Sequence, residues 1–197
     1  IQLNRNIAFN LGAWVKNMDQ LTSMQKYRSG TQDYWVMKNY DFGRAQGLDF
    51  MIQTRGLPVN INMQYTLSEA KSNEEHDWSR LGVAVTDAPA EEYLMSYDRT
   101  HDLSLTLSTF LPYGVILSMT SFYQTGAPYT PLEQANPGSN IIQESEFKNS
   151  VRMADFYKTD MSLSKYMKFG DSKIALGVSI YNLFDRRNGI DIHRLTG

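Results

Sequence analysis

One histidine lies among residues that could form a hydrolytic site. His101 stands between Asp98 and Asp102, with Ser104 nearby, and a nucleophile beside a base is the usual arrangement for covalent hydrolysis. Successive residues of an extended strand face opposite sides, so residues 98, 102 and 104 share one face and His101 takes the other. A working site would need partners from other strands, and we expect no enzymatic activity.

Two further segments resemble binding sites in composition. His76 is flanked by Glu74, Glu75 and Asp77, donors that suit a hard or borderline cation. Adjacent side chains in an extended loop point apart, and a solvated loop explains the same charges, so we predict no metal and no cofactor. Residues 126–131 lack the Gly-Lys-Ser/Thr ending of a phosphate-binding loop, and their prolines stiffen a loop base instead.

Composition excludes several classes of function. The chain has 197 residues, a formal net charge of -2 and no cysteine. Near-neutral charge without a basic cluster argues against nucleic-acid binding, and the absence of cysteine removes disulfides and thiolate chemistry. The sequence contains no apolar run of about 18 residues, so no transmembrane helix is expected.

Alternation of apolar and polar residues is the main structural signal. From Val59 to Ser68 every odd position is apolar and every even position is polar and uncharged. Such a strand separates two different surroundings, and its face of asparagine, glutamine, threonine and serine suits a water-filled lumen. The same pattern predicts strands at 1–15, 102–108, 115–124, 160–167 and 174–180, and either one long strand or two strands turning near 41–43 over 34–55.

Long and short connections alternate between these strands. Tight turns containing glycine or proline are expected at 55–58, 111–114 and 169–172. Long loops are expected at 17–32, 69–97 and 126–155, with a short helix near 90–95. A soluble sheet protein has no reason to place every long loop at one end, whereas outer-membrane barrels do. We therefore expect an all-β fold, an antiparallel transmembrane β-barrel of which about seven strands are present.

The two faces of these strands are expected to meet different surroundings. The side chains expected to face lipid are Ile61, Met63, Leu103, Leu105, Leu107, Leu176 and Val178. The side chains expected to face the lumen are Asn62, Gln64, Thr66, Asp102, Ser104, Thr106, Ser162 and Ser164. Aromatic residues fall mostly near strand ends, where outer-membrane barrels carry interfacial girdles.

Four segments resemble one known family. They stand in that family's order and are residues 39–49 (Asn-Tyr-Asp-Phe-Gly-Arg-Ala-Gln-Gly-Leu-Asp), 98–103 (Asp-Arg-Thr-His-Asp-Leu), 125–131 (Thr-Gly-Ala-Pro-Tyr-Thr-Pro) and 181–188 (Tyr-Asn-Leu-Phe-Asp-Arg-Arg-Asn). With them the chain resembles the C-terminal part of the barrel of TonB-dependent outer-membrane receptors. The resemblance carries over architecture, because these elements look structural in the family.

The resemblance implies a location and a role. Residues 1–197 would form the C-terminal portion of the barrel domain in the outer membrane of a Gram-negative bacterium, with the plug domain and the final strand outside this chain. The protein would import a scarce nutrient, such as a metal chelate, vitamin, oligosaccharide or peptide, with energy from TonB. The alternative is a passive channel or a structural barrel without a plug.

The resemblance also suggests partners and contacts. Outer-membrane lipid and lipopolysaccharide would surround the barrel, the TonB complex would act through the plug, and a surface lipoprotein is a further candidate partner. Aromatic loop residues stack on solutes and donate hydrogen bonds to them. The candidate solute contacts are Tyr27, Trp78, Tyr93 and Tyr129.

Overall fold

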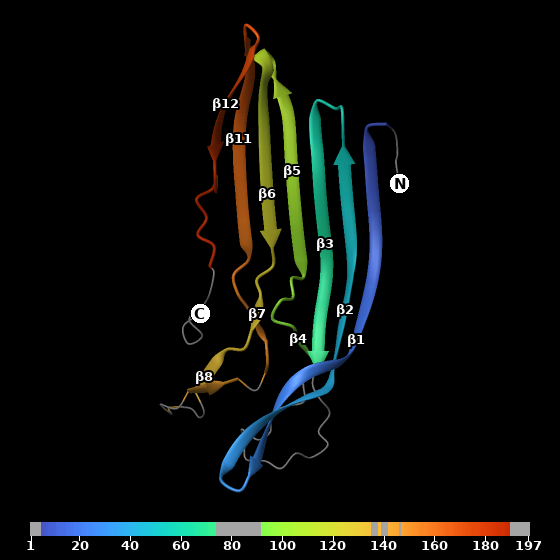
Figure 1. The fold of residues 1–197 in the computed structure, drawn as a ribbon, viewed down its shortest axis with the longest axis vertical. Coiled ribbons are helices and arrows are strands. Elements are labelled where there is room, and N and C mark those ends of the chain that lie inside the picture. Colours follow the sequence, from blue (N-terminus) through green and yellow to red (C-terminus); the bar gives the residue numbers. More distant parts are fainter. Residues whose placement is uncertain (1–4, 74–91, 135–137, 139–141, 146, 190–197) are drawn as a thin grey trace.

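The computed structural model describes residues 5–73, 92–134, 138, 142–145 and 147–189. Their main feature is one antiparallel sheet (Figure 1). Seven strands pair in the order β1-β2-β3-β5-β6-β11-β12, and the short strand β4 adds to β3. The strands are β1 (Ile7–Ser29), β2 (Gln32–Thr54), β3 (Val59–Asn73), β4 (Glu92–Leu94), β5 (His101–Leu111), β6 (Val115–Gln124), β11 (Phe156–Phe169) and β12 (Ser172–Ile180).

The sheet is an up-and-down meander, and three of its short connections lie together at one end. The turn after β2, the 3-10 turn at Pro112–Gly114 and the turn after β11 lie together at the top of Figure 1. The connections from β3 to β5 and from β6 to β11 lie at the opposite end, called here the long-loop end. The three expected tight turns are confirmed, and the expected asymmetry holds for the connections after β2, whereas β1 and β2 are joined by a two-residue turn at the long-loop end.

Register gives the sheet one apolar and one polar face. Residues that stand opposite each other in antiparallel strands share a face. One apolar row crosses β3, β5, β6, β11 and β12, and its members are Ile61, Leu107, Met119, Met161 and Ile180. A polar row crosses the same strands on the other face, and its members are Asn60, Ser108, Ser118, Ser162 and Ser179.

The residues expected to face lipid and those expected to face a lumen lie on these two opposite faces. Ile61 pairs with Leu107 and Met63 with Leu105, whereas Asn62 pairs with Thr106 and Gln64 with Ser104. Which face meets lipid stays a prediction. The separation itself follows from the two-residue period of a strand, because a slip of one residue would exchange the faces completely.

No second layer covers the apolar face among the described residues. Ala70 is the only buried hydrophobic residue in the described part of the chain, and it lies on the polar face, whereas Leu11, Leu176 and Val178 are 67%, 56% and 67% exposed. A water-soluble sheet normally buries one face against another layer. Within the described part of the chain, the side chains of this apolar face are therefore largely open.

The first hairpin is longer than the sequence predicted. The expected loop at 17–32 is wrong: β1 continues to Ser29, and only Gly30 and Thr31 separate it from β2. A β-bulge lies between Met18 and Thr22, where the apolar period is lost and Gln20 adopts a φ of 58°. Backbone pairing with β2 carries the strand through this stretch, since a ladder does not need alternating side chains.

Of the two alternatives for residues 34–55, the single long strand is the one observed, because β2 is unbroken through 41–43. The loop expected at 69–97 needs correction at both ends, since β3 extends to Asn73. Within the short helix expected at 90–95, residues 92–94 form β4 instead, paired with Lys71–Asn73. Hydrogen bonds to the end of β3 therefore outweigh the local preference of these residues for a helix.

The connection between β6 and β11 contains small strands of its own. Strand β7 (Pro128–Tyr129) pairs with β10 (Val151–Arg152), and β8 (Leu132–Gln134) pairs with β9 (Ile142–Glu144). The expected loop at 126–155 is therefore partly ordered into two ribbons.

No helix among the described residues is long and apolar enough to cross a bilayer.

Gly47 allows an aromatic ring to lie flat on the polar face. Gly47 pairs with Trp14 on β1 and with Ser68 on β3. A Cβ at this glycine would lie 2.7 Å from Cζ2 of Trp14 and 2.9 Å from the carbonyl oxygen of Leu67. The indole therefore covers the strand where the side chain is missing.

We expect Gly47→Ala to destabilise the sheet by about 1–3 kcal/mol, because the new methyl group meets both an indole and a backbone oxygen. Gly12→Ala is the matched control, since its Cβ would find only Asp49 Cβ at 3.9 Å. Denaturant unfolding of the full-length protein measures both variants. Equal stability of the two variants would contradict the packing described at Gly47.

Candidate functional site

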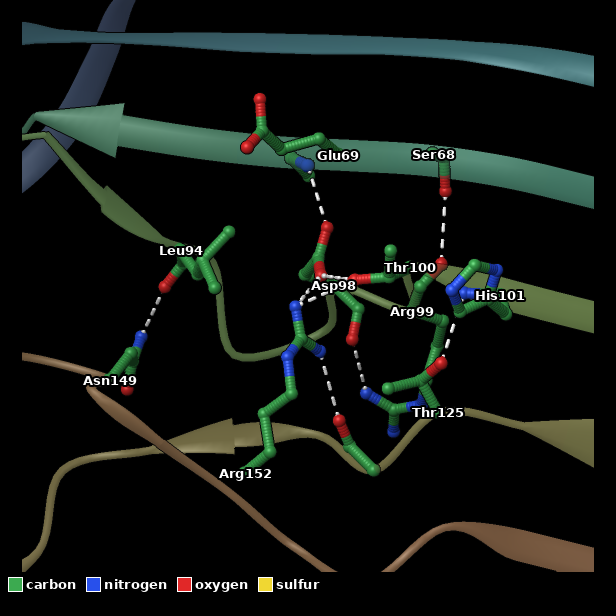
Figure 2. A network of polar contacts seen from close by, with 12 residues as sticks. Ser68, Glu69, Leu94, Asp98, Arg99, Thr100, His101, Thr125, Asn149 and Arg152 are labelled. Carbon is green, nitrogen blue, oxygen red and sulfur yellow. Dashed lines mark hydrogen bonds and ion pairs between the residues drawn. The ribbon is translucent and has the colours of Figure 1, made fainter.

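An ion pair joins the two long connections at their bases (Figure 2). Asp98 precedes β5 and is 2% exposed, and Arg152 lies in β10. Oδ1 of Asp98 accepts the backbone N–H of Ala70 at 2.7 Å, and Oδ2 pairs with Nη2 of Arg152. Both oxygens of a buried carboxylate are thus satisfied, as a buried charge requires.

The guanidinium of Arg152 reaches three acceptors. Besides Asp98, Nη2 donates to Oγ1 of Thr100 at 2.8 Å, and Nη1 donates to the carbonyl oxygen of Gly126 at 3.0 Å. A planar fork of donors suits this arrangement, whereas a lysine offers a single nitrogen. Arg152 therefore connects the start of β5 with the end of β6.

Gly126 lets the chain close around this contact. A Cβ at Gly126 would lie 1.8 Å from the carbonyl oxygen of Met153. The Met153 N–H donates to the carbonyl oxygen of Ala127 at 2.9 Å. Only a residue without a side chain permits such an approach, so this glycine is needed to bring β10 and Arg152 against the loop base.

A second contact between the same two connections involves Tyr93. Tyr93 stands opposite Ser72, which places it on the polar face. Nζ of Lys148 lies 4.5 Å from the centroid of the Tyr93 ring and 3.3 Å from its hydroxyl. Asn149 donates from Nδ2 to the carbonyl oxygen of Leu94 at 2.6 Å. Residues 148–149 thus hold β4 from the other connection.

The structure does not gather the four predicted solute contacts. Tyr93 joins this site, but Tyr129 pairs with Val151 and so lies on the face of its ribbon opposite to Arg152. Trp78 and the side chain of Tyr27 lie outside the described part of the chain. Solute binding by any of the four stays a prediction.

A hollow of about 490 Å³ lies beside the network, lined by residues 13–15, 46–48 and 67–69 and by Thr100. Thr100 also belongs to the Asp98–Arg152 network. Concave sites of this size are typical for small solutes. Trp14 is the aromatic residue of this lining, and sequence reasoning missed it because it stands among the polar positions of an alternating strand.

Sequence reasoning also missed Arg152. It is 54 residues away from Asp98, so no local spacing connects the two. The signal available in the sequence was indirect: Asp98 and Gly126 each stand in a segment that resembles one family. The pairing itself required the three-dimensional structure.

The residues of the hydrolase hypothesis are separated. His101 shares a face with Tyr65, and Nδ1 lies 2.8 Å from the tyrosine hydroxyl. Asp102 lies on the other face, where its Oδ2 accepts Nε2 of Gln124 at 2.8 Å. The opposite orientation of His101 and Asp102 is confirmed, while the presence or absence of catalysis is untested.

The residues of the metal hypothesis are not placed. His76 and its acidic neighbours lie outside the described residues. Among the described ones, no group of three histidine, cysteine, aspartate or glutamate side chains is arranged to hold a metal ion.

After β12, one backbone hydrogen bond, from the Leu183 N–H to the Thr159 carbonyl at 2.7 Å, and several side-chain hydrogen bonds hold the chain to β11. Asn188 accepts the Tyr157 N–H on Oδ1 at 3.0 Å and donates from Nδ2 to the Tyr157 carbonyl at 2.9 Å. Asn182, with a φ of 55°, donates its N–H to Oδ1 of Asp160 at 2.8 Å. The segment 181–188 is therefore attached to β11 although it is not a strand.

Asp155 holds the end of the β6–β11 connection. Its Oδ1 accepts the Gly126 N–H at 3.0 Å and its Oδ2 accepts the Tyr123 hydroxyl at 2.8 Å. The Gly126 amide first, and the Tyr123 hydroxyl second, hold the pKa of the Asp155 carboxyl below its ordinary value of 3.8. The ionised form is therefore the one that the fold stabilises.

Comparison with known proteins identifies the fold. No family model matches the sequence, and a comparison with curated proteins finds no match. The chain is similar in structure to the outer membrane transporter YddB from Escherichia coli, with a TM-score of 0.58 and 15% sequence identity. The match covers 94% of this chain and 27% of that protein, so the chain spans about a quarter of it. The expected all-β fold is confirmed, as an antiparallel sheet that matches a fragment of an outer membrane transporter.

The lowered pKa of Asp155 predicts an acid-sensitive loop base. A carboxylate with a depressed folded pKa stabilises the fold above its unfolded pKa and loses this contribution as the pH falls through the folded value. We expect Asp155→Asn to unfold more easily than the unchanged protein at neutral pH, and to lose less stability below about pH 4. Denaturant unfolding of the full-length protein across this range measures the effect, with the exposed turn residue Asp171→Asn as control. Parallel pH profiles for Asp155→Asn and the unchanged protein would contradict the prediction.

Proposed function

We propose that this chain is part of the barrel of a TonB-dependent outer-membrane receptor that imports a scarce nutrient, such as a metal chelate, vitamin, oligosaccharide or peptide. The observation that carries the proposal is the apolar face of the sheet, which no described residues cover, opposite a face of polar side chains. The likeness to an outer membrane transporter in 94% of the chain adds support.

A bilayer is the partner that best fits the apolar face. Lipid offers no hydrogen bonds, so a strand can cross it only when its neighbours satisfy its backbone. Strands β5 and β6 have 11 and 10 residues, close to the roughly 9–11 residues of a tilted transmembrane strand. Both are paired on each side in the sheet, as lipid exposure requires.

The structural roles of the family-like segments support the receptor over other barrels. Gly47 leaves space for the indole of Trp14. Arg152 contacts both Asp98 and Gly126. Asn188 attaches the last described segment to β11. Each of the four segments that resemble the family thus makes a specific contact. Coupling to TonB itself rests on the resemblance, and we propose transport without a catalytic step.

The proposed membrane face has a direct test in a matched pair of adjacent residues. Ile61→Arg should cost about 2–4 kcal/mol if the side chain lies near the middle of the bilayer, whereas Asn62→Arg should be tolerated better because its face is polar. The full-length protein is folded into lipid vesicles and its unfolding is followed by tryptophan fluorescence. If Asn62→Arg were the more damaging change, the two faces would be assigned the wrong way round.

The proposed energy coupling separates the receptor from a passive channel, since both would have the same apolar face. We expect a strain that relies on the full-length protein for a limiting ferric chelate, cobalamin, oligosaccharide or peptide to stop growing when TonB is deleted. Deletion of the gene in a TonB-containing strain is the control. Growth that depends on the gene but survives the loss of TonB would indicate a passive channel.

A further inference from the structure

We propose that Asp98 and Arg152 form a latch that makes the bases of the two long connections one rigid unit, so that residues 92–98 move together with residues 126–131 and 147–153. This inference is independent of transport in its test. It rests on the proposed function only for its consequence, which is that both connections would present a single surface to the solute.

At the latch, a negatively charged side chain of one connection pairs with a positively charged side chain of the other. The Asp98 side chain is 0% exposed and the Arg152 side chain is 27% exposed. Removing one member of a buried ion pair leaves the other charge without compensation, which is strongly unfavourable. Without Arg152, the described partners of the Asp98 carboxylate are the Ala70 N–H and the Thr100 hydroxyl. Loss of either side chain should therefore separate the two connections at this point.

The latch lies beside contacts that also link the two connections. On one side, β4 carries Tyr93 and Leu94; on the other, Lys148 lies over the Tyr93 ring and Asn149 binds the Leu94 carbonyl. The Lys148–Tyr93 contact is exposed and the Asn149–Leu94 contact is half-buried, and single polar interactions at such sites contribute little to stability. The buried pair is the stronger tie, and the position of Lys148 against Tyr93 should depend on it.

The connecting backbone transmits the effect of the latch. Arg152 is in β10, whose partner β7 is Pro128–Tyr129. The backbone of Asn149 is fixed to the same segment, because its N–H donates to Thr130 Oγ1 at 3.0 Å. On the other side, the Asp98 N–H donates to the Met95 carbonyl at 2.8 Å, and the Met95 N–H to the Ala70 carbonyl at 2.9 Å. Asp98 and β4 are thus tied to the same end of β3.

Distance measurement between the connections tests the latch. Glu92 and Ser150 are exposed, and the chain has no cysteine of its own, so Glu92→Cys with Ser150→Cys accepts a pair of spin labels in the full-length protein. We expect a narrow distance distribution in the otherwise unchanged protein. Arg152→Met should widen it about twofold, since local opening then replaces a fixed contact, and Asp98→Asn should widen it as well.

Two control variants separate the latch from a general loss of stability. Lys158→Met breaks another ion pair, with Asp160, at 35% and 23% side-chain exposure, and should leave the distribution narrow. Arg152→Lys keeps the charge but cannot reach Asp98, Thr100 and Gly126 together, so it should restore the narrow distribution only in part. The distances are measured on the folded protein only, which is recognised by a gel mobility that changes when the sample is heated.

The outcomes are distinct. A distribution that stays equally narrow in Arg152→Met and Asp98→Asn would overturn the latch, as would equal widening by Lys158→Met. If neither latch variant folds, Asn149→Ala provides the second measurement: the latch predicts that the distribution stays narrow, because the ion pair remains, and widening would overturn it. The readout is a distance and does not depend on transport. If the distances show the latch but the protein takes up no nutrient, the proposed function is wrong and the latch stands.

Discussion

Backbone pairing between neighbouring strands is the constraint on which this structure depends. Seven strands of the main sheet pair in their order along the chain, and the same register that forms the hydrogen bonds also sorts the side chains onto two faces. A sheet that satisfies its own backbone can leave one apolar face without a protein layer, provided that lipid covers it. The uncovered face and the regular ladder are therefore two aspects of one arrangement.

Side chains take over this task where the ladder ends. Asn188 pairs with both backbone groups of Tyr157, Thr125 accepts the N–H of His101, and Asp98 accepts the N–H of Ala70. All of these ends lie towards the long-loop end of the sheet (Figure 1). Three of the four segments that resemble one family contain these residues, because the geometry at a strand end depends on particular side chains, whereas most positions within a strand accept many.

The errors of sequence reasoning have one physical origin. The stretch 17–32 lost its apolar alternation and was expected to be a loop, yet it is paired from strand to strand up to the turn at Gly30. Residues 92–94 were expected in a helix and instead complete the edge of β3. In both places hydrogen bonds to a partner strand decided the conformation, and periodicity in a single segment does not report on a partner.

Local chain geometry and the two-residue period of a strand were enough to predict the alternating strands, three tight turns and the division of side chains into two sets. Which residues meet at the long-loop end depends instead on the assembled sheet. Asp98 and Arg152 are 54 residues apart, and their contact requires the order of the strands, the close approach at Gly126 and the placement of β4. A buried ion pair between distant segments has no local signature, since its free energy depends on burial that only the assembled sheet provides.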